Sequence, residues 1–164
     1  MNVIFLDVDG VVNIPLWHID EQGQYKCRYN FPEDGLVNSF QSAQWVSEFC
    51  EKFNYKVVIS STWRKDGLGI CKDCLYNGGL RKSIDIIDTT PILDNKHRCD
   101  EITEWLSQHP EVTGYLIFDD ESDVTIHIDR LVKCDTVVGF TLRKYNTAET
   151  LHYAFNNIRK DTLN

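Results

Sequence analysis

Two aspartates one residue apart, Asp7 and Asp9, follow a short apolar run at residues 3–6 and precede Gly10. If that run is a buried β-strand, both carboxylates point to the same face of the strand. Like charges this close raise each other's pKa unless a cation lies between them. Carboxylate oxygens suit Mg²⁺ better than zinc. The pair therefore indicates half of a magnesium site; the alternative is an acidic turn, because Asp and Gly are ordinary turn residues.

A second acidic group comes much later in the chain, directly after the apolar run at residues 113–118. Its four acids lie within five residues: Asp119, Asp120, Glu121 and Asp123. A solvated acidic loop is the ordinary interpretation of such a group. Because it follows the same kind of predicted strand as Asp7 and Asp9, we interpret it as the other half of the metal site.

Hydroxyl side chains follow another apolar run. Residues 56–60 predict a buried strand that ends in Ser60 and leads into Ser61 and Thr62. Hydroxyl groups gathered at a strand end can bind a phosphate oxygen, and Ser60 and Ser61 are the candidates. The alternative is that Ser61 or Thr62 caps the next helix. Both interpretations can hold together, since neighbouring side chains point different ways.

Two basic residues, Lys96 and Arg98, lie at or just before a predicted helix at residues 100–108. Ile102, Trp105 and Leu106 share one face of that helix. The ordinary interpretation of the two cations is that both are solvated. The dipole at the start of a helix does not favour positive charge, however, so their position hints at another purpose.

Strands and helices that must position these side chains alternate along the sequence. We predict buried strands at residues 3–6, 56–60, 83–87 and 113–118, a short edge strand at 136–139, and helices at 39–53, 100–108 and from Asn146 or Thr147 to about residue 158. This alternation favours a three-layer, Rossmann-like α/β fold with a mostly parallel sheet and helices on both faces. Ligands of such sheets bind beyond the carboxyl ends of the strands. The candidates that fall there are Asp7, Asp9, Ser60, Asp119 and Asp120.

Two segments have less regular patterns. Residues 16–19 and 25–29 flank a polar turn that contains glycine, which predicts a β-hairpin after the first strand. We expect its aromatic residues to pack the hairpin onto the domain rather than to contact a substrate. Residues 64–80 predict at most a short helix, because four glycines interrupt them. Cys71 and Cys74 in that stretch lack the two further ligands of a zinc site, so a metal or redox role is not favoured.

The composition is that of an ordinary globular protein. The 164 residues are 42% hydrophobic and 26% charged, which suits one domain spanning residues 1–164. The net charge of −8 argues against an extended nucleic-acid-binding surface but not against a basic pocket for one phosphate. We see no membrane-spanning run and no signal peptide, so we expect no membrane partner. The six cysteines then indicate reduced thiols and a cytoplasmic protein.

Taken together, the motifs resemble those of the haloacid-dehalogenase-like (HAD) superfamily of phosphohydrolases. Residues 5–12 (FLDVDGVV) match its first motif and residues 58–60 (VIS) its second. Arg98 or Lys96, before a helix, matches the third, and residues 117–120 (IFDD) match the fourth. All four occur in the required order.

The chain is also similar to a compact HAD subgroup, found as a phosphatase domain in bacterial RNA-repair proteins and as stand-alone chains. The similarity rests on residues 58–64 (VISSTWR), residues 88–91 (DTTP), and the spacing from Arg98 to Glu101. Members of this subgroup have little or no cap domain, so the resemblance implies only the small hairpin flap. Residues 67–79 depart from the pattern of the subgroup. A helix without glycine interruptions is expected there, whereas this stretch contains several glycines and two cysteines.

The resemblance implies a mechanism for the acidic residues. Asp7 is the nucleophile that takes up the phosphoryl group as an aspartyl-phosphate. Asp9 protonates the leaving oxygen and then acts as a base toward water. The resemblance further implies that Asp7, the backbone carbonyl of Asp9 and Asp120 hold Mg²⁺, with Asp119 nearby.

Phosphate-binding roles also follow from the resemblance. Ser60 and the backbone amide of Ser61 hold phosphate oxygens. Arg98, or Lys96 in its place, stabilises charge on Asp7 and on the phosphoryl group. The choice between these two basic residues stays open at this point, with the spacing favouring Arg98.

The sequence leaves three functional hypotheses open. The leading hypothesis is a Mg²⁺-dependent phosphomonoesterase acting on nucleotides, on nucleic-acid terminal phosphates or on a small phosphorylated metabolite. The alternative is a catalytically silent HAD-fold domain with a binding or regulatory role, which the intact acidic set disfavours. A third hypothesis is that Cys71 and Cys74 make the protein's activity dependent on a bound metal or on the redox state.

Overall fold

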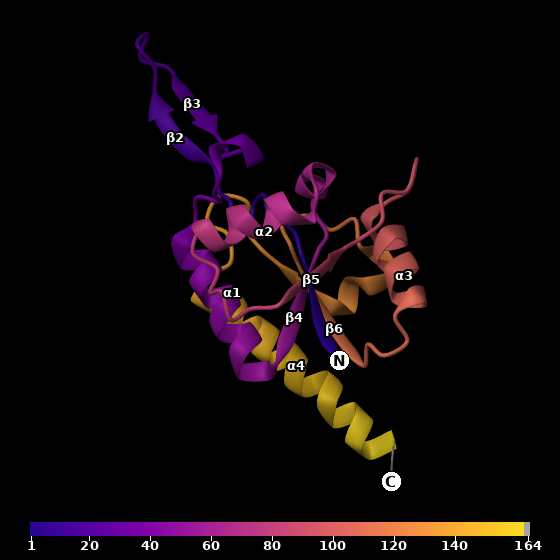
Figure 1. Ribbon diagram of the computed structural model, residues 1–164. Coiled ribbons are helices and arrows are strands. Elements are labelled where there is room, and N and C mark those ends of the chain that lie inside the picture. The colour runs from indigo at the N-terminus through magenta and orange to yellow at the C-terminus, as the bar shows by residue number, and fades with distance from the viewer. Residues whose placement is uncertain (163–164) are drawn as a thin grey trace.

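A five-stranded sheet forms the centre of the molecule, and every strand runs parallel to its neighbours. The computed structural model describes the backbone of residues 1–162 and the side chains of residues 1–155. The strand order is β5-β4-β1-β6-β7 (Figure 1). The strands are β1 (Asn2–Leu6), β4 (Tyr55–Ile59), β5 (Ile86–Thr89), β6 (Gly114–Asp119) and β7 (Leu131–Lys133). The predicted α/β fold with a parallel sheet is confirmed.

Helices cover both faces of this sheet and complete the predicted three layers (Figure 1). On one face lie α1 (Phe40–Phe53), α2 (Leu68–Asn77) and α4 (Leu142–Thr162), and on the other lies α3 (Arg98–Gln108). Side chains alternate between the faces of a strand. In β1, Ile4 and Leu6 accordingly join the core under α1, while Val3 and Phe5 join the core under α3. This central strand is buried on both faces, which explains its continuous apolar run.

The edges of the sheet differ from the prediction. The expected strand at residues 83–87 starts later in the structure, at Ile86, and the expected edge strand at residues 136–139 is wrong. Those four residues form a turn closed by a bridge between Asp135 and Gly139. The edge strand is β7 instead, which pairs with β6 over only three residues. A strand that short has too few alternating positions to stand out in a sequence.

The last helix also begins earlier than predicted. α4 starts at Leu142 rather than after Asn146 or Thr147, and it buries Tyr145 and Ala148 against the sheet. Further along the helix, Leu151 and Phe155 pack partly against the core. None of the helices in the described part of the chain combines the length and apolar character needed to cross a membrane.

Residues 64–80 hold more helix than predicted. The short 3-10 helix η2 (Thr62–Asp66) is followed by α2, which contains Gly69 in its first turn. α2 buries Cys71, Cys74 and Leu75 in the core, and this buried face stabilises the helix despite its glycine. Two further 3-10 helices are η1 (Pro32–Asp34) and η3 (Thr125–Arg130).

The predicted hairpin is present, but it does not pack on the domain. β2 (Leu16–Ile19) and β3 (Tyr25–Arg28) pair antiparallel and stand clear of the body of the molecule (Figure 1). Trp17 is 59% exposed and Tyr25 is 77% exposed, so the expectation that these aromatic residues hold the hairpin down is wrong. The turn closes locally instead, through the Asp20 carboxylate, which accepts two backbone hydrogen bonds. The described residues contain no large cap domain, as the resemblance implied.

Candidate active site

The carboxyl ends of β1 and β6 bring three carboxylates together. The two strands are neighbours, with Leu6 opposite Phe118, so Asp7 and Asp119 lie at the same edge of the sheet. One oxygen from each of Asp7, Asp119 and Asp120 lies within 4.8 Å of the other two. Acids that are more than a hundred residues apart in the chain thus form one cluster, as the parallel arrangement of strands predicts.

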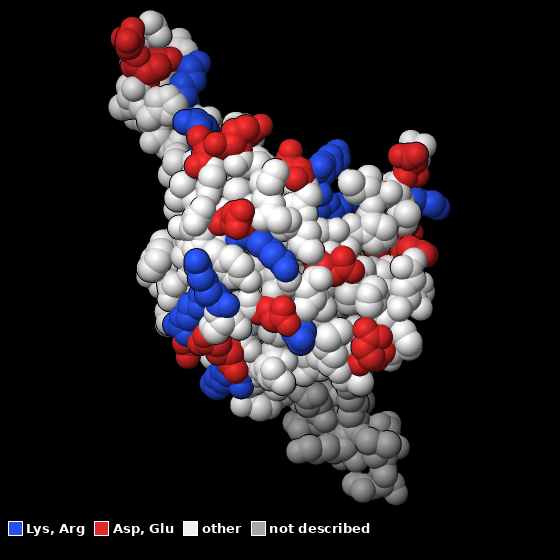
Figure 2. Space-filling view, viewed as in Figure 1, with Lys and Arg blue, Asp and Glu red and all other residues white. Residues whose placement is uncertain are grey.

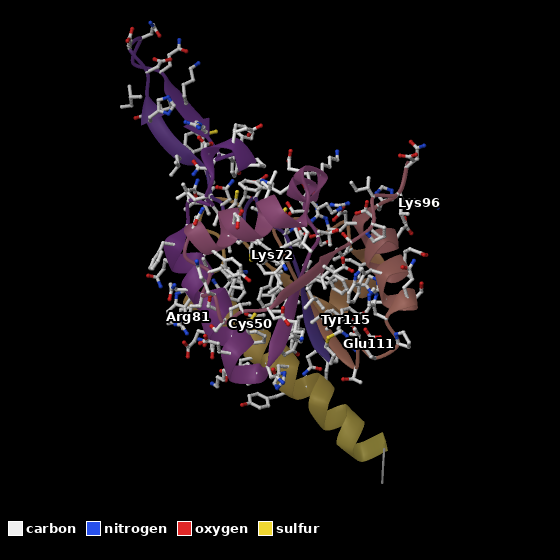
Figure 3. The ribbon with its side chains drawn as sticks, in the orientation of Figure 1. Cys50, Lys72, Arg81, Lys96, Glu111 and Tyr115 are labelled. Atoms are coloured by element: carbon white, nitrogen blue, oxygen red, sulfur yellow. The ribbon has the colours of Figure 1, made fainter. Side chains whose placement is uncertain are left out.

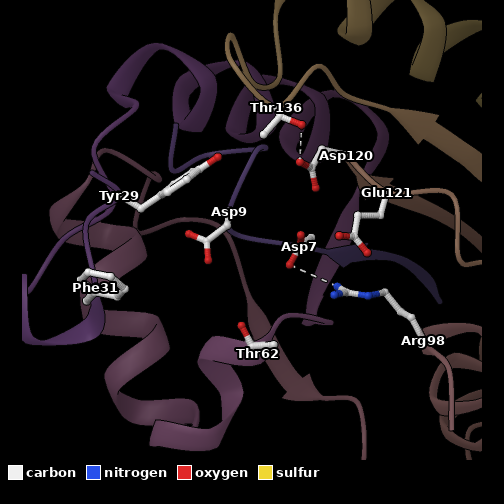
Figure 4. A pocket seen from close by; sticks show the side chains of 9 residues that line it. All are labelled: Asp7, Asp9, Tyr29, Phe31, Thr62, Arg98, Asp120, Glu121 and Thr136. Atoms are coloured by element: carbon white, nitrogen blue, oxygen red, sulfur yellow. Dashed lines mark hydrogen bonds and ion pairs between the residues drawn. The ribbon is translucent and has the colours of Figure 1, made fainter. Parts of the chain in front are cut away.

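Asp120 lies against the backbone of Gly10, and only glycine fits there. Gly10 has a φ of 73°, in the left-handed region that side chains disfavour. A Cβ on this residue would lie 2.2 Å from Asp120 Oδ2. The same oxygen accepts a hydrogen bond from Thr136 Oγ1 at 2.7 Å (Figure 4). The glycine of the first motif therefore makes room for an acid of the fourth.

Arg98, the first residue of α3, reaches into the acidic cluster. Its Nη1 lies 3.1 Å from Asp7 Oδ1 and 3.2 Å from Asp119 Oδ2. Lys96 is exposed and does not join this group, and Figure 3 shows it at the outer end of the segment that leads into α3. Of the two basic residues that the sequence left open, Arg98 is the one in contact with Asp7.

The electrostatics of the cluster favour a cation. Burial raises the pKa of both Asp7 and Asp119, and the Arg98 guanidinium opposes that rise. Three carboxylates against one guanidinium leave an excess of negative charge. Asp119 Oδ2 has its ion pair with Arg98 but accepts no hydrogen bond of good geometry within the described part of the chain. An all-oxygen donor set with this charge fits Mg²⁺.

Ser60 and Ser61 lie at the neighbouring strand end, after β4. The Ser60 backbone amide donates to Leu6, but its buried hydroxyl has no hydrogen-bond partner among the described residues. An unpaired buried hydroxyl is uncommon and is available to a ligand oxygen. The Ser61 hydroxyl accepts from the Trp63 backbone amide at 3.5 Å and so caps η2. It also lowers the pKa of Asp7 by hydrogen bonding, so Ser61 contacts both the helix and the acid.

Asp9 stands apart from the three clustered carboxylates, and two donors hold its side chain. Asn13 Nδ2 donates to Asp9 Oδ1 at 2.6 Å, and Trp63 Nε1 donates to Asp9 Oδ2 at 3.1 Å. Both donors are buried. Sequence reasoning missed these two residues, although Trp63 was part of the pattern that indicated the subgroup.

Two adjoining pockets have Arg98 in their walls. The central pocket has a volume of about 470 Å³ and is lined by Asp7, Asp9, Tyr29, Phe31, Thr62, Arg98, Asp120, Glu121 and Thr136 (Figure 4). The second pocket has a volume of about 280 Å³ and is lined by Thr62, Arg64, Lys65, Ile92, Leu93, Lys96, His97, Arg98, Glu101 and Asp123. Because Thr62 and Arg98 belong to both, a ligand in the central pocket can extend into the second.

Residues 3–145 match the family model described as the HAD domain in Swiss Army Knife RNA repair proteins. The chain belongs to this family. The match covers all four motifs, so the expected resemblance to the HAD superfamily and to its RNA-repair subgroup is confirmed. No individual curated protein matches the chain. Membership supports a phosphatase-type function for this HAD domain.

A buried ion pair joins two elements that border the HAD site, η2 and α3. Arg64 Nη2 lies 2.6 Å from Glu101 Oε2, and both side chains are almost fully buried. Arg64 Nη1 also donates to the Ser61 carbonyl at 2.6 Å, while the Leu93 amide donates to Glu101. The pair thus links the segment after β4 to α3. Through the hydrogen bond from Arg64 to Ser61, the pair fixes the Ser61 backbone relative to α3, the helix that begins with Arg98, a role that the sequence patterns did not reveal.

Cys71 and Cys74 lie in the core of this HAD domain rather than at its site. Both are free and buried, and they face the apolar cluster under α2. Burial raises the pKa of the Cys71 thiol to about 11, which disfavours the thiolate that metal binding or redox chemistry needs. In the described part of the chain, the group of side chains with metal-binding geometry is the acidic one. The two cysteines therefore serve packing.

Proposed function

We propose that this HAD domain is a Mg²⁺-dependent phosphomonoesterase that works through an aspartyl-phosphate. The observation that carries the proposal is the position of Asp7, which faces the central pocket with Asp119, Asp120 and Arg98 around it. A carboxylate that attacks a phosphate needs positive charge beside both anions. Arg98 supplies part of that charge, and the acidic donor set around Asp7 suits a divalent cation.

The reaction has two steps at phosphorus. In the first, an Asp7 oxygen forms a bond to phosphorus while the bond to the leaving oxygen breaks and Asp9 gives that oxygen a proton. In the second, Asp9 takes a proton from water, the water oxygen bonds to phosphorus, and the Asp7–phosphorus bond breaks. Inorganic phosphate is released and Asp7 is restored. Asn13 and Trp63 act as positioning residues, because their hydrogen bonds hold Asp9 in one orientation.

The acidic cluster is the proposed Mg²⁺ site. Asp7, the backbone carbonyl of Asp9 and Asp120 would hold the ion, with Asp119 beside them. When bound, Mg²⁺ neutralises the repulsion between the nucleophile and the phosphate and stabilises charge in the transition state. Gly10 contributes by leaving room for Asp120.

The phosphoryl oxygens are proposed to contact Ser60, Ser61 and Arg98. The unpaired hydroxyl of Ser60 and the backbone amide of Ser61 are donors at the end of β4. Arg98 is our candidate for the charge beside Asp7, since it lies 3.1 Å away. Lys96 lines the second pocket, so it is proposed to contact a further phosphate of the substrate rather than the one that is transferred.

The proposed substrates are nucleotides or nucleic-acid terminal phosphates. The description of the family concerns RNA repair, and the second pocket offers Lys65, Lys96 and His97 to an additional anionic group. Acidic and basic side chains are interspersed on the face seen in Figure 2, and the net charge is −8, so we expect no extended nucleic-acid-binding surface. A terminus bound at the site fits these features better than a long duplex.

We also propose that the chain forms one domain. A single sheet carries both apolar cores, and α1, α2, α3 and α4 contribute side chains to these cores. The six cysteines are free thiols, in keeping with the cytoplasmic location expected from the sequence.

Phosphate release from a panel of substrates tests the proposed function. The panel holds nucleoside monophosphates, sugar phosphates, and oligonucleotides phosphorylated at the 3′ or the 5′ end, each with Mg²⁺ and with a chelator. We expect turnover that requires Mg²⁺. Asp7→Asn removes the nucleophile and should reduce kcat by roughly 10³-fold or more, with folding verified by thermal unfolding.

The matched control is Asp73→Asn, which makes the same change at an exposed acid of α2 outside the two pockets. It should keep wild-type kcat. Unchanged turnover in Asp7→Asn would show that the nucleophile is a different residue. Absence of turnover with every substrate would favour the alternative, a catalytically silent HAD-fold binding domain.

A further inference from the structure

Two aromatic residues, Tyr29 and Phe31, line the central pocket on the side of Asp9 (Figure 4). They come from the segment that follows β3, just before η1. Phe31 is 56% exposed, so its ring is available at the rim instead of being used in the core. Tyr29 is half-buried, and burial together with the negative charges of Asp120 and Asp9 raises the pKa of its phenol. Its ring thus lies close to the reacting groups.

Hydrogen bonds fix this aromatic segment to Asp9. The amide of the fully buried Asn13 donates to Asp9 at 2.6 Å and also to the backbone carbonyl of Asn30 at 2.9 Å. Asn30 is the residue between the two aromatic side chains. One amide group therefore sets the distance between the aromatic segment and the carboxyl group that handles the proton.

The other end of the segment is fixed as well. The Phe31 backbone amide donates to Asp34 Oδ2 at 2.8 Å. Asp34 also pairs with Arg28 at the end of β3. On its other side, the Phe31 carbonyl accepts a hydrogen bond from the Asp34 backbone amide at 2.9 Å. The exposed ring is therefore carried by a backbone that is held on both sides, so it can receive a ligand without first having to be ordered.

The proposed proton transfer from Asp9 indicates which part of a substrate contacts these rings. Resting on the proposed function, Asp9 must lie beside the oxygen of the leaving group. Figure 4 shows Tyr29 and Phe31 on the same side of the pocket as Asp9, whereas Arg98 and Glu121 lie on the opposite side. The group attached to the leaving oxygen therefore emerges next to the two aromatic rings.

We propose that Tyr29 and Phe31 form the binding site for the leaving group and select one that carries a planar ring, such as the base of a nucleoside. Stacking on exposed aromatic side chains is how proteins bind bases without requiring a particular sequence. The rim position of Phe31 and the half-buried ring of Tyr29 offer such surfaces beside Asp9.

The outer part of the hairpin is not included in this site. Its turn carries Asp20 and Glu21, and Figure 2 shows acidic atoms at that tip. An anionic substrate is repelled there. Trp17 and Tyr25 of β2 and β3 do not line either of the two pockets around the acids. They serve as internal controls, because they are exposed aromatic residues of the same hairpin.

Two pairs of oligonucleotides provide the test, and the members of each pair differ only in the terminal base. One pair carries a 3′-terminal phosphate and the other a 5′-terminal phosphate. The terminal nucleoside has adenine in one member of each pair and is abasic in the other. The wild-type protein should show a kcat/KM roughly tenfold or more higher for the adenine form. Phe31→Ala and Tyr29→Ala should each reduce this ratio toward one.

Conservative variants and controls separate stacking from a structural effect. Tyr29→Phe keeps the ring and should keep most of the ratio, whereas Phe31→Leu keeps apolar bulk without the ring and should lose it. Tyr25→Ala and Trp17→Ala should leave the ratio at the wild-type value. The ratio compares two substrates on one protein, so a partly unfolded preparation does not change it.

Several results would overturn the assignment. A wild-type ratio near one for both pairs excludes selection of the ring. A ratio that survives in Phe31→Ala and Tyr29→Ala, or that falls as much in Tyr25→Ala, places the recognition elsewhere. Loss of turnover with every probe, base present or absent, contradicts the phosphatase proposal itself and with it the assignment. Turnover of both members without preference contradicts only the aromatic site.

Discussion

Both carboxylate oxygens of Asp9 are engaged by donors of the protein itself. Asn13 donates to Oδ1 and Trp63 donates to Oδ2. A carboxyl group held in this way keeps one orientation, which proton transfer to a leaving group requires. Asn13 lies only four residues after Asp9, but Trp63 lies 54 residues away. The proposed acid is thus positioned by a residue whose contact exists only in the folded chain.

Gly10 provides a test of the acidic cluster at the level of one atom. Gly10→Ala adds a Cβ that would lie 2.2 Å from Asp120 Oδ2, so the carboxylate must move. We expect the Mg²⁺ concentration for half-maximal activity to rise at least roughly tenfold, because a displaced ligand weakens a metal site. Titrating phosphate release with Mg²⁺ measures this.

The control for that prediction is Gly23→Ala in the hairpin turn. Gly23 has a φ of 76°, close to that of Gly10, but no atom lies within 4 Å of its added Cβ. It therefore reproduces the backbone strain, about 1 kcal/mol, without touching an acid. An equal change in Mg²⁺ dependence in both variants would mean that strain alone, and not contact with Asp120, explains the effect.

Among the elements, those that the sequence predicts well are the ones buried on both sides. β1, β4 and β6 are continuous apolar runs, and the acids and hydroxyls that follow them meet at one edge because neighbouring strands are parallel. The failures have physical reasons. β7 is three residues long, and the ladder continues beyond it through a hydrogen bond that the Cys134 backbone amide donates to the Asp119 carbonyl. The hairpin has aromatic residues that normally indicate packing, yet it is stabilised by its own turn and ladder.

The side chains that support the site could not be given their roles from the sequence, for a different reason. Arg64 and Glu101 belong to the patterns that indicated the subgroup, but only the fold shows that they form a buried pair. The same applies to Asn13, whose amide joins Asp9 to the aromatic segment. Their roles depend on contacts between distant elements, which no local pattern contains.

The junction of η3, α3 and β6 predicts a pH-dependent stability. His127 is buried there, with Nε2 at 2.9 Å from Thr103 Oγ1 and Nδ1 at 2.8 Å from the Tyr115 hydroxyl. Burial lowers the pKa of His127; the Cys99 backbone and Asp129 oppose this, and Arg130 adds to it.

The unfolded chain therefore binds a proton at His127 at a higher pH than the folded protein does. As the pH falls through about 6.5, protonation favours the unfolded state, and the free energy of unfolding decreases. Urea unfolding at about pH 7.5 and about pH 5.5 should show a loss on the order of 1 kcal/mol larger in the wild type than in His127→Gln. Equal losses in the two proteins would mean that His127 does not titrate differently on folding.

At the scale of the whole molecule, the net charge of −8 should repel the proposed anionic substrate. The second pocket offsets this repulsion near the site, because Lys65, Lys96 and His97 line it together with Arg98. Beyond a Debye length of about 8 Å, salt screens the acidic remainder of the surface. Attraction of a substrate is then determined by the charges next to the site rather than by the sum over the protein.

Salt dependence tests whether those lysines meet further phosphates. Lys65→Gln combined with Lys96→Gln should lower kcat/KM for a phosphorylated oligonucleotide and make its dependence on salt shallower, with the logarithmic slope smaller by about 1.4 if both lysines contact a phosphate of a single strand. For ribose 5-phosphate, which has no second phosphate, the decrease should be several-fold smaller. Lys72→Gln with Lys82→Gln makes the same change in net charge away from both pockets. If this control pair flattens the salt dependence equally, general electrostatic attraction explains the effect and the second pocket does not contact the substrate.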